Sequence, residues 1–184
     1  MSEKDTSKYL ETFPAWLRGL GEDAEGLAAL LSDGKAPGPA QEAVTGGLNY
    51  LFKSLDLIPD GIDDIGYLDD AFVLRVAADL ATKEDLSKVD SQSMRSVGKL
   101  SNECDVVREF LEKDYDRLET YVRGLKRGAA RGRSVSDILG NNKVRNEFLA
   151  DVHGFAKSYS SPSFSREEKN LIKLRAFFDA KLPK

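Results

Sequence analysis

Residues 54–72 read SLDLIPDGIDDIGYLDDAF and carry six aspartates within fifteen residues, together with one proline and two glycines. The acidic side chains alternate here with leucines and isoleucines, which prefer burial. Three explanations fit such a pattern: a tight turn between helices, a cation site, or a membrane-associated device. The backbone chemistry of the stretch favours the turn.

Pro59 marks the centre of this turn. It lacks an amide hydrogen and its ring clashes with the preceding helical turn, so it cannot continue a helix. The residue before a proline is pushed toward extended geometry. Gly61 and Gly66 permit backbone angles that are closed to other residues. We therefore expect helices over residues 39–55 and 67–81 to form a hairpin.

The preference for acidic residues at the start of a helix explains the position of several of these aspartates. Asp63 or Asp64 is placed to cap the second helix. Asp69 and Asp70 then fall in its first turn, where the macrodipole favours negative charge. On this interpretation the aspartates determine the fold and bind no ligand.

Asp69 and Asp70 also stand at the head of two apolar sides of a helix that is apolar nearly all round. A buried carboxylate needs a hydrogen-bond donor, a counter-charge or a metal ion. The candidates are backbone amides at the helix start, Arg75, Lys53, a basic residue from the C-terminal half, or a cation.

The stretch does not form an EF-hand. A calcium loop beginning at Asp56 would need a ligand at its third position and a bidentate Glu at its twelfth. The chain has Ile58 and Tyr67 at these positions. A looser site for Mg²⁺, Mn²⁺ or Ca²⁺ remains open, because hard cations take carboxylate oxygens. Its candidate ligands are Asp56, Asp60, Asp69 and Asp70.

Two motifs in this region resemble those of the YkvA-like proteins, a family labelled as a domain of unknown function. They are DLIPD, residues 56–60, and GYLDD, residues 66–70. The resemblance covers about residues 41–81 and implies no established activity. Many relatives carry bulky apolar residues and a proline between the motifs, in hairpins that look membrane-associated. This chain has Gly61, Asp63 and Asp64 there, which weakens the membrane interpretation.

The rest of the chain predicts an all-α fold, a helical bundle of about six or seven helices built around the central hairpin. Pro14 is placed to open a short N-terminal helix, and a second short helix spans residues 22–31. Residues 82–102 are polar and ambiguous. A long helix follows with one apolar face: Val107, Leu111, Tyr115, Leu118, Val122 and Leu125. Two helices, around 146–159 and 165–182, close the chain.

The domain organisation expected is an N-terminal helical region, residues 1–90, that contains the hairpin at about 41–81. Residues 91–184 form C-terminal helices packed on it as one globular unit. Residues 1–70 carry 14 acids and 5 bases, whereas the remainder carries 17 acids and 22 bases. This asymmetry favours docking of the two parts against each other. The modest net charge of −4 disfavours a dedicated nucleic-acid binder.

A basic run follows the long helix. Phosphate groups of nucleic acid or anionic lipid are one explanation for it. The alternative is cations at a helix C-terminus together with a solvated linker. The aromatic residues on which single-strand binders stack bases are absent from the run. The residues that would make an anion or lipid contact are Arg123, Lys126, Arg127, Arg131 and Arg133.

Catalytic motifs are absent from the sequence: there is no G-x-S-x-G elbow, Walker loop or dinucleotide fingerprint. A pair made of Cys104 and His153, the only cysteine and histidine, would have to meet in space. The single cysteine excludes an internal disulfide and, with the charged N-terminus and the lack of a long apolar run, predicts a cytoplasmic protein. Peripheral membrane contact stays open.

Two functions follow as hypotheses. The first is a non-enzymatic protein-interaction or scaffold module whose partner is another protein. The second is a divalent-cation-dependent hydrolase in which the aspartates hold a cation that activates water. We prefer the first, because no separate general base or substrate-binding motif accompanies the acids. Whether the chain is an enzyme is left undecided by the sequence.

Overall fold

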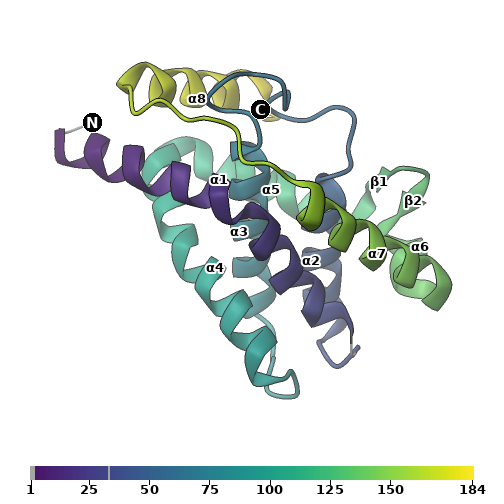
Figure 1. Cartoon of the computed structure of the whole chain (residues 1–184). Coiled ribbons are helices and arrows are strands. Elements are labelled where there is room, and N and C mark those ends of the chain that lie inside the picture. The colour runs from purple at the N-terminus through teal and green to yellow at the C-terminus, as the bar shows by residue number, and fades with distance from the viewer. Residues whose placement is uncertain (1–2, 33) are drawn as a thin grey trace.

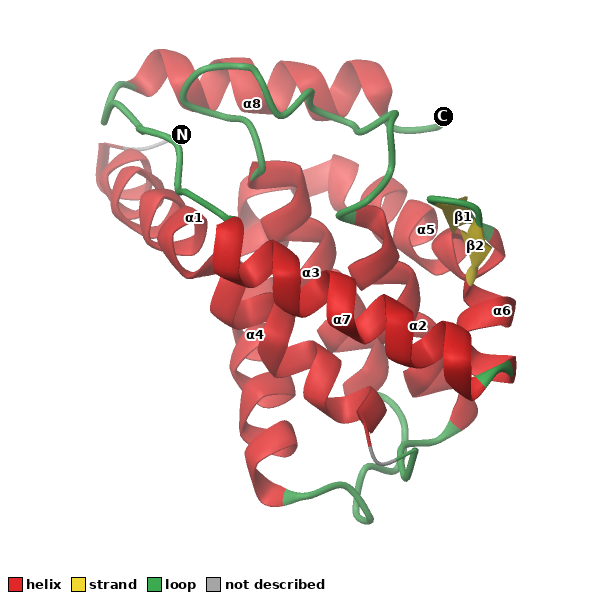
Figure 2. Cartoon of the chain, turned by 45° about the vertical axis from the view of Figure 1, so that its right-hand side comes forward, coloured by secondary structure: helices red, strands yellow, loops and turns green. Residues whose placement is uncertain are grey.

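The computed structural model describes residues 3–32 and 34–184, and it confirms the all-α fold. Figure 2 shows helices throughout, apart from one small β-hairpin. The α-helices are α1 (Glu3–Ser32), α2 (Gly38–Tyr50), α3 (Leu68–Thr82), α4 (Ser91–Leu111), α5 (Tyr115–Gly124), α6 (Val135–Gly140), α7 (Asn142–Ser158) and α8 (Glu168–Lys181). The strands are β1 (Ala129–Ala130) and β2 (Arg133–Ser134), and the 3-10 helices are η1 (Glu112–Asp114) and η2 (Leu125–Arg127).

Helix α3 lies at the centre of the molecule (Figure 1). It contacts α1, α2, α4 and α5, and all its residues except Asp79 and Thr82 are buried. The predicted hairpin is present, because α2 packs directly against α3. A glycine allows this close packing: a Cβ atom at Gly47 would lie 2.6 Å from the Cβ of Ala77.

Helix α8 crosses one end of the bundle in both Figures 1 and 2. Aromatic rings join it to the core, since Phe178 of α8 stacks on Phe72 of α3 at 5.2 Å between ring centroids. Phe72 also meets Phe13 of α1 and Phe110 of α4 edge to face. One apolar core therefore holds segments from both ends of the chain.

The prediction of two short N-terminal helices is wrong. Helix α1 runs without a break, with Pro14 inside it rather than in its first turn. Its apolar stripe continues through Leu17, Leu20 and Leu27, all fully buried. Burial of one continuous face therefore outweighs the local cost of the proline and the glycines. Gly21 is needed for packing, because a Cβ there would lie 3.1 Å from the carbonyl oxygen of Ala156 in α7.

The prediction of one long helix ending near Leu125 is wrong in its continuity. All six residues of its apolar face are buried, but α4 ends at Leu111 and α5 starts at Tyr115. Glu112 between them has φ 51°, which interrupts the helical backbone. In the polar region that the sequence left ambiguous, Asp90 caps α4 by accepting hydrogen bonds from the amides of Gln92 and Ser93.

Candidate cation site at the turn between α2 and α3

The turn spans residues 51–67 and begins earlier than predicted, because α2 ends at Tyr50 rather than near Leu55. Gly66 is required, but for a different reason from the one expected: a Cβ there would lie 2.3 Å from the carbonyl oxygen of Asp60. The left-handed backbone conformations belong instead to Asp64 (φ 71°) and Tyr67 (φ 64°). Asparagine and aspartate tolerate this conformation, whereas a tyrosine there is strained.

Neither Asp63 nor Asp64 caps α3, so this prediction is wrong. Tyr67 is the N-cap residue and makes no side-chain capping bond. Asp64 accepts a hydrogen bond from the amide of Ser165 at 2.7 Å instead. The turn is thereby tied to the segment that leads into α8.

Asp69 is the anchor of the turn. Its Oδ2 accepts hydrogen bonds from the Tyr50 hydroxyl at 2.6 Å and from the Ile58 amide at 3.0 Å. The Tyr50 hydroxyl in turn accepts from the Leu57 amide at 2.7 Å. One carboxylate and one phenol therefore satisfy two amides of a turn that has no helix or sheet partners.

Three carboxylate oxygens at this place are buried and have no hydrogen-bond partner: Asp56 Oδ1, Asp69 Oδ1 and Asp70 Oδ2. Asp69 and Asp70 are 0% and 3% exposed, as the sequence predicted from the apolar surroundings of α3. A buried unpaired carboxylate is costly unless it takes up a proton or a cation. We call Asp56, Asp60, Asp69 and Asp70 the turn aspartates.

The pKa values of the turn aspartates show the same excess of negative charge. Burial raises the pKa of Asp69 to about 6, although its hydrogen bonds with Tyr50 and Ile58 act in the opposite direction. Burial and then the charge of Asp69 raise the pKa of Asp70 well above its usual range. Burial, followed by the charges of Asp69 and Asp60, raises the pKa of Asp56 to about 7. These carboxyls therefore share one electrostatic environment.

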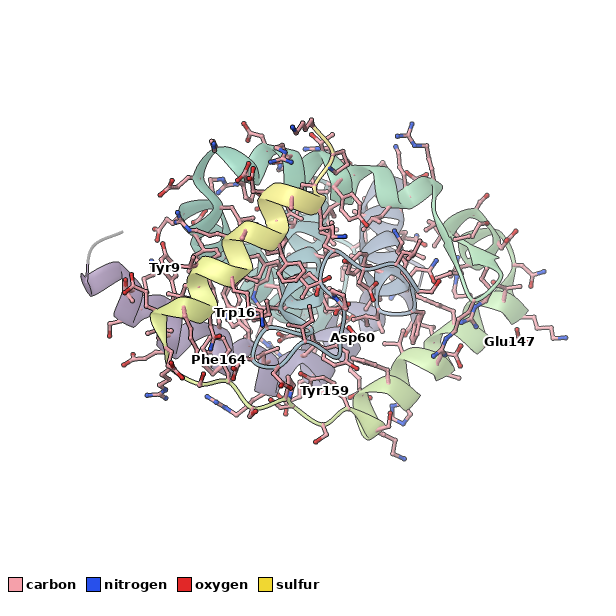
Figure 3. All side chains as sticks on the ribbon, turned by 90° about the horizontal axis from the view of Figure 1, so that it is seen from above. Tyr9, Trp16, Asp60, Glu147, Tyr159 and Phe164 are labelled. Carbon is pink, nitrogen blue, oxygen red and sulfur yellow. The ribbon has the colours of Figure 1, made fainter. Side chains whose placement is uncertain are left out.

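Asp60 is the exposed member of the turn aspartates. Figure 3 shows it on the face that is seen from above, near Tyr159. Partial burial raises its pKa, and a hydrogen bond with the Tyr67 hydroxyl lowers it. Burial also raises the pKa values of Tyr50, Tyr67 and Tyr159, so these phenols stay neutral and serve as donors rather than counter-charges.

Neither of the predicted side-chain counter-charges forms an ion pair with the turn aspartates. Lys53 lowers the pKa of Asp56 by its charge, but its Nζ donates to the Tyr121 hydroxyl at 3.0 Å. Arg75 lies further along α3 and pairs with Asp23 at 3.0 Å and Glu103 at 2.6 Å.

Converging ligands for a metal are not preformed in the described part of the chain. Within residues 3–32 and 34–184, no group of three or more His, Cys, Asp or Glu residues is arranged so that it could hold a metal ion. Fewer protein ligands suffice for some ions, because Mg²⁺ is usually held by one or two carboxylates and keeps several waters.

Tyr50 and Tyr67 were missed by sequence reasoning. Each is an aromatic residue with one polar atom, a type that needs a hydrogen-bond partner when its ring is buried. Tyr50 stands just before the first motif and Tyr67 inside the second, and this placement next to the acids is the signal that could have identified them.

The predicted basic run is divided among several contacts. Arg123 pairs with Glu119, and Lys126 with Glu42. Arg131 and Arg133 both pair with Asp151, and they also lie over the rings of Phe52 and Phe148. Arg127 differs from the other four in that no ion pair joins it to any described residue.

Cys104 and His153 have different partners. Cys104 is buried in α4 beside the Tyr115 hydroxyl at 3.4 Å, and burial raises its pKa to about 11. His153 is exposed on α7 and lies against Glu25 of α1. A thiol with this pKa is a poor nucleophile, and nothing in the geometry makes a catalytic pair of the two residues.

Comparison with family models, with curated proteins and with solved structures finds no match for this chain. The resemblance to the YkvA-like proteins therefore stays a prediction from the two motifs. None of the helices within the described residues is long and apolar enough to cross a membrane.

Proposed function

We propose that this chain is a non-enzymatic helical module that contacts another protein, and that the turn aspartates take up Mg²⁺ or Mn²⁺ to hold the α2–α3 turn in its binding shape. The three buried carboxylate oxygens without partners carry this proposal. A cation supplies the neutralisation that no ion pair with a lysine or arginine of residues 3–32 and 34–184 provides to them, since Lys53 acts on Asp56 only through its charge at a distance.

Mg²⁺ and Mn²⁺ fit the site better than Ca²⁺. Ca²⁺ takes six to eight oxygen ligands, whereas Mg²⁺ keeps much of its water and needs one or two carboxylates. Asp69 and Asp70 each offer one buried oxygen, and Asp56 and Asp60 lie close enough to raise the pKa of Asp70 by their charge. Because ligands must be deprotonated, uptake of the ion increases with pH and releases protons.

A binding role is favoured over hydrolysis by the depth of the site. A substrate must reach a catalytic metal, and Asp69 and Asp70 are almost completely buried. The rim of the turn is instead suited to contact with a protein. Leu55 is 83% exposed, the highest value among the large apolar side chains that the structure exposes. The resemblance to the YkvA-like proteins adds one expectation to this proposal. In those proteins, too, the two motifs should form a turn of the same kind between two helices.

The test is thermal unfolding in EDTA and then in Mg²⁺, Mn²⁺ or Ca²⁺, with Asp70→Asn as the site variant. Its matched control is Asp63→Asn, the same charge change at an exposed position of the same turn. An ion at 100 times its dissociation constant stabilises the fold by ~2.7 kcal/mol, which corresponds to a rise of about 5–10 °C in Tm. We expect this rise in the wild type and in Asp63→Asn, and not in Asp70→Asn.

Two results would contradict the proposal. If no ion raises the Tm of the wild type, the aspartates are turn residues that are neutralised by protons. If the protein hydrolyses p-nitrophenyl phosphate with Mn²⁺, and Asp70→Asn does not, the turn is a hydrolase site and the non-enzymatic part is wrong.

A further inference from the structure

A cavity of about 590 Å³ has Lys53 in its wall, and none of the turn aspartates lines it. Its walls come from α5, from η2 and from the chain after α8. The residues that line it are Lys53, Asp116, Arg117, Thr120, Tyr121, Gly124, Leu125, Arg127, Gly128, Pro183 and Lys184. This volume falls within the range of sites that hold small organic molecules.

The walls of this cavity combine apolar surface with positive charge. Tyr121, Leu125 and Pro183 provide apolar surface. The two glycines of the lining have no side chains that would fill the cavity. Four of the lining side chains are basic and one, Asp116, is acidic. A molecule that is apolar at one end and anionic at the other matches such walls.

The basic residues of the cavity are not equivalent. Arg117 is committed to the protein itself: it pairs with Asp114 and Asp179 and donates to the carbonyl oxygens of Asp179, Leu182 and Pro183. Among the described residues, no carboxylate lies within ion-pair distance of Lys184, which belongs to the segment after α8, or of Lys53 and Arg127 in the rest of the wall. Lys53 and Arg127 are therefore free to meet an anion.

Lys53 is also held in place. Its Nζ donates to the Tyr121 hydroxyl at 3.0 Å and lies 5.3 Å from the centroid of that ring and 5.6 Å from the centroid of Tyr50. A lysine fixed between two rings loses less side-chain freedom when it binds a ligand. Arg127 adds a planar guanidinium, whose fork matches two phosphate oxygens.

We infer that this cavity binds a small phosphate monoester with an aromatic or aliphatic body, whose phosphate meets Lys53 and Arg127 and whose body lies against Tyr121 and Leu125. A phosphate dianion matches two unpaired cations, whereas a carboxylate carries one charge. The inference does not depend on a cation at the turn aspartates. The inference also narrows the earlier hypothesis that the basic run contacts an anion. Arg127 is the one residue of that run that lines this cavity.

Isothermal titration calorimetry with phenyl phosphate, in EDTA, tests the inference, with inorganic phosphate and benzoate as reference ligands. The site variants are Lys53→Met and Arg127→Gln. The control is Arg123→Gln, which removes the same charge from a nearby position that does not line the cavity and pairs with Glu119. Arg127 is exposed, so its variant keeps the fold.

We expect phenyl phosphate to bind more tightly than both reference ligands, and each site variant to weaken it by about tenfold or more, equivalent to ~1.4 kcal/mol. The control variant should change the affinity by less than about twofold, because one screened surface charge contributes little. The inference is overturned if phenyl phosphate does not bind, if benzoate binds as tightly, or if Arg123→Gln weakens binding as much as Arg127→Gln. Since EDTA is present, these outcomes are independent of the cation experiment.

Discussion

Two groups of charged residues surround helix α3: in one the charges balance, and in the other they are all acidic. Near its middle, Arg75 pairs with Asp23 and Glu103, Lys99 also pairs with Asp23, and the Trp16 ring lies 3.9 Å from the guanidinium carbon. At its N-terminus and in the preceding turn, the turn aspartates contribute four carboxyls, and Lys53, whose charge acts on Asp56, donates to the Tyr121 hydroxyl.

This difference in charge balance distinguishes the Arg75 group, which is a structural network, from the turn aspartates, which are a candidate binding site. In the first group two cations form ion pairs with two carboxylates, which offsets the desolvation of these charges, although Arg75 Nε has no hydrogen-bond partner and Glu103 Oε2 meets Arg75 only as an ion pair. In the second group three buried oxygens have no partner. Burial alone therefore does not mark a functional residue, whereas burial without compensation does.

The largest effect should come from breaking the balanced network with Arg75→Met. The change leaves Asp23 and Glu103 without their buried cation, and removing one partner of a buried pair costs ~3–5 kcal/mol. Urea unfolding measures the loss. The matched control is Arg123→Met, an exposed pair in a helix, for which we expect less than about 0.5 kcal/mol. A loss at Arg75 no larger than the control would mean that the network does not stabilise the fold.

The next effect concerns the backbone that assembles the turn aspartates. Gly66→Ala places a Cβ 2.3 Å from the carbonyl oxygen of Asp60, and backbone cannot move away cheaply. We expect a loss of about 2–3 kcal/mol in urea unfolding. Gly61→Ala is the control, because nothing lies within 4 Å of a Cβ at that position. Equal losses for both variants would remove the close-approach explanation.

A smaller effect is expected from Asp70→Asn in EDTA. Burial and then the charge of Asp69 raise the pKa of this carboxyl well above its usual range, which favours its protonated form, and an amide of the same shape should replace that form with a change of less than about 1 kcal/mol in the free energy of unfolding. A much smaller loss of unfolding free energy for Asp70→Asn than for Arg75→Met would support the distinction between the two groups of charges. A loss of several kcal/mol at Asp70 would show that its charge is compensated by a partner, as in the Arg75 network.

A dependence of stability on pH in EDTA is the last expected effect, and it reports on the turn aspartates as a group. The folded pKa values of Asp69 and Asp56, about 6 and about 7, lie above the unfolded value of ~3.9 for aspartate. The folded state therefore binds more protons between about pH 4 and 7, and stability falls as the pH rises through this window. The raised pKa of Asp69 alone corresponds to ~3 kcal/mol over this window, so we expect a Tm decrease of about 6–12 °C.

Thermal unfolding at several pH values measures this slope. Asp56→Asn should flatten it because it removes one titrating group, whereas Asp63→Asn should leave it unchanged. A Tm that rises with pH in the wild type, with the same slope in Asp56→Asn, would contradict the raised pKa values.

Much of the fold was predictable because it depends on local chemistry. Pro59 predicted that no helix runs through residues 54–66, although α2 already ends at Tyr50, and the all-apolar sides of α3 predicted the burial of Asp69 and Asp70. The continuity of α1 and the break at Glu112 were not predictable. Both are decided by which apolar faces must be buried together, and helix propensity is too weak to overrule that.

The sequence by itself determined the all-α class, the α2–α3 turn and the concentration of acid at the start of a buried helix. These follow from the geometry of proline and from helical periodicity, which act over a few residues. Only the tertiary structure decided that Arg75 is committed to Asp23 and Glu103, and that Lys53, bonded to Tyr121, lines the same cavity as Arg127. Electrostatic partners are chosen by proximity in space, and residues that are many helical turns apart in the sequence carry no local signal of their pairing.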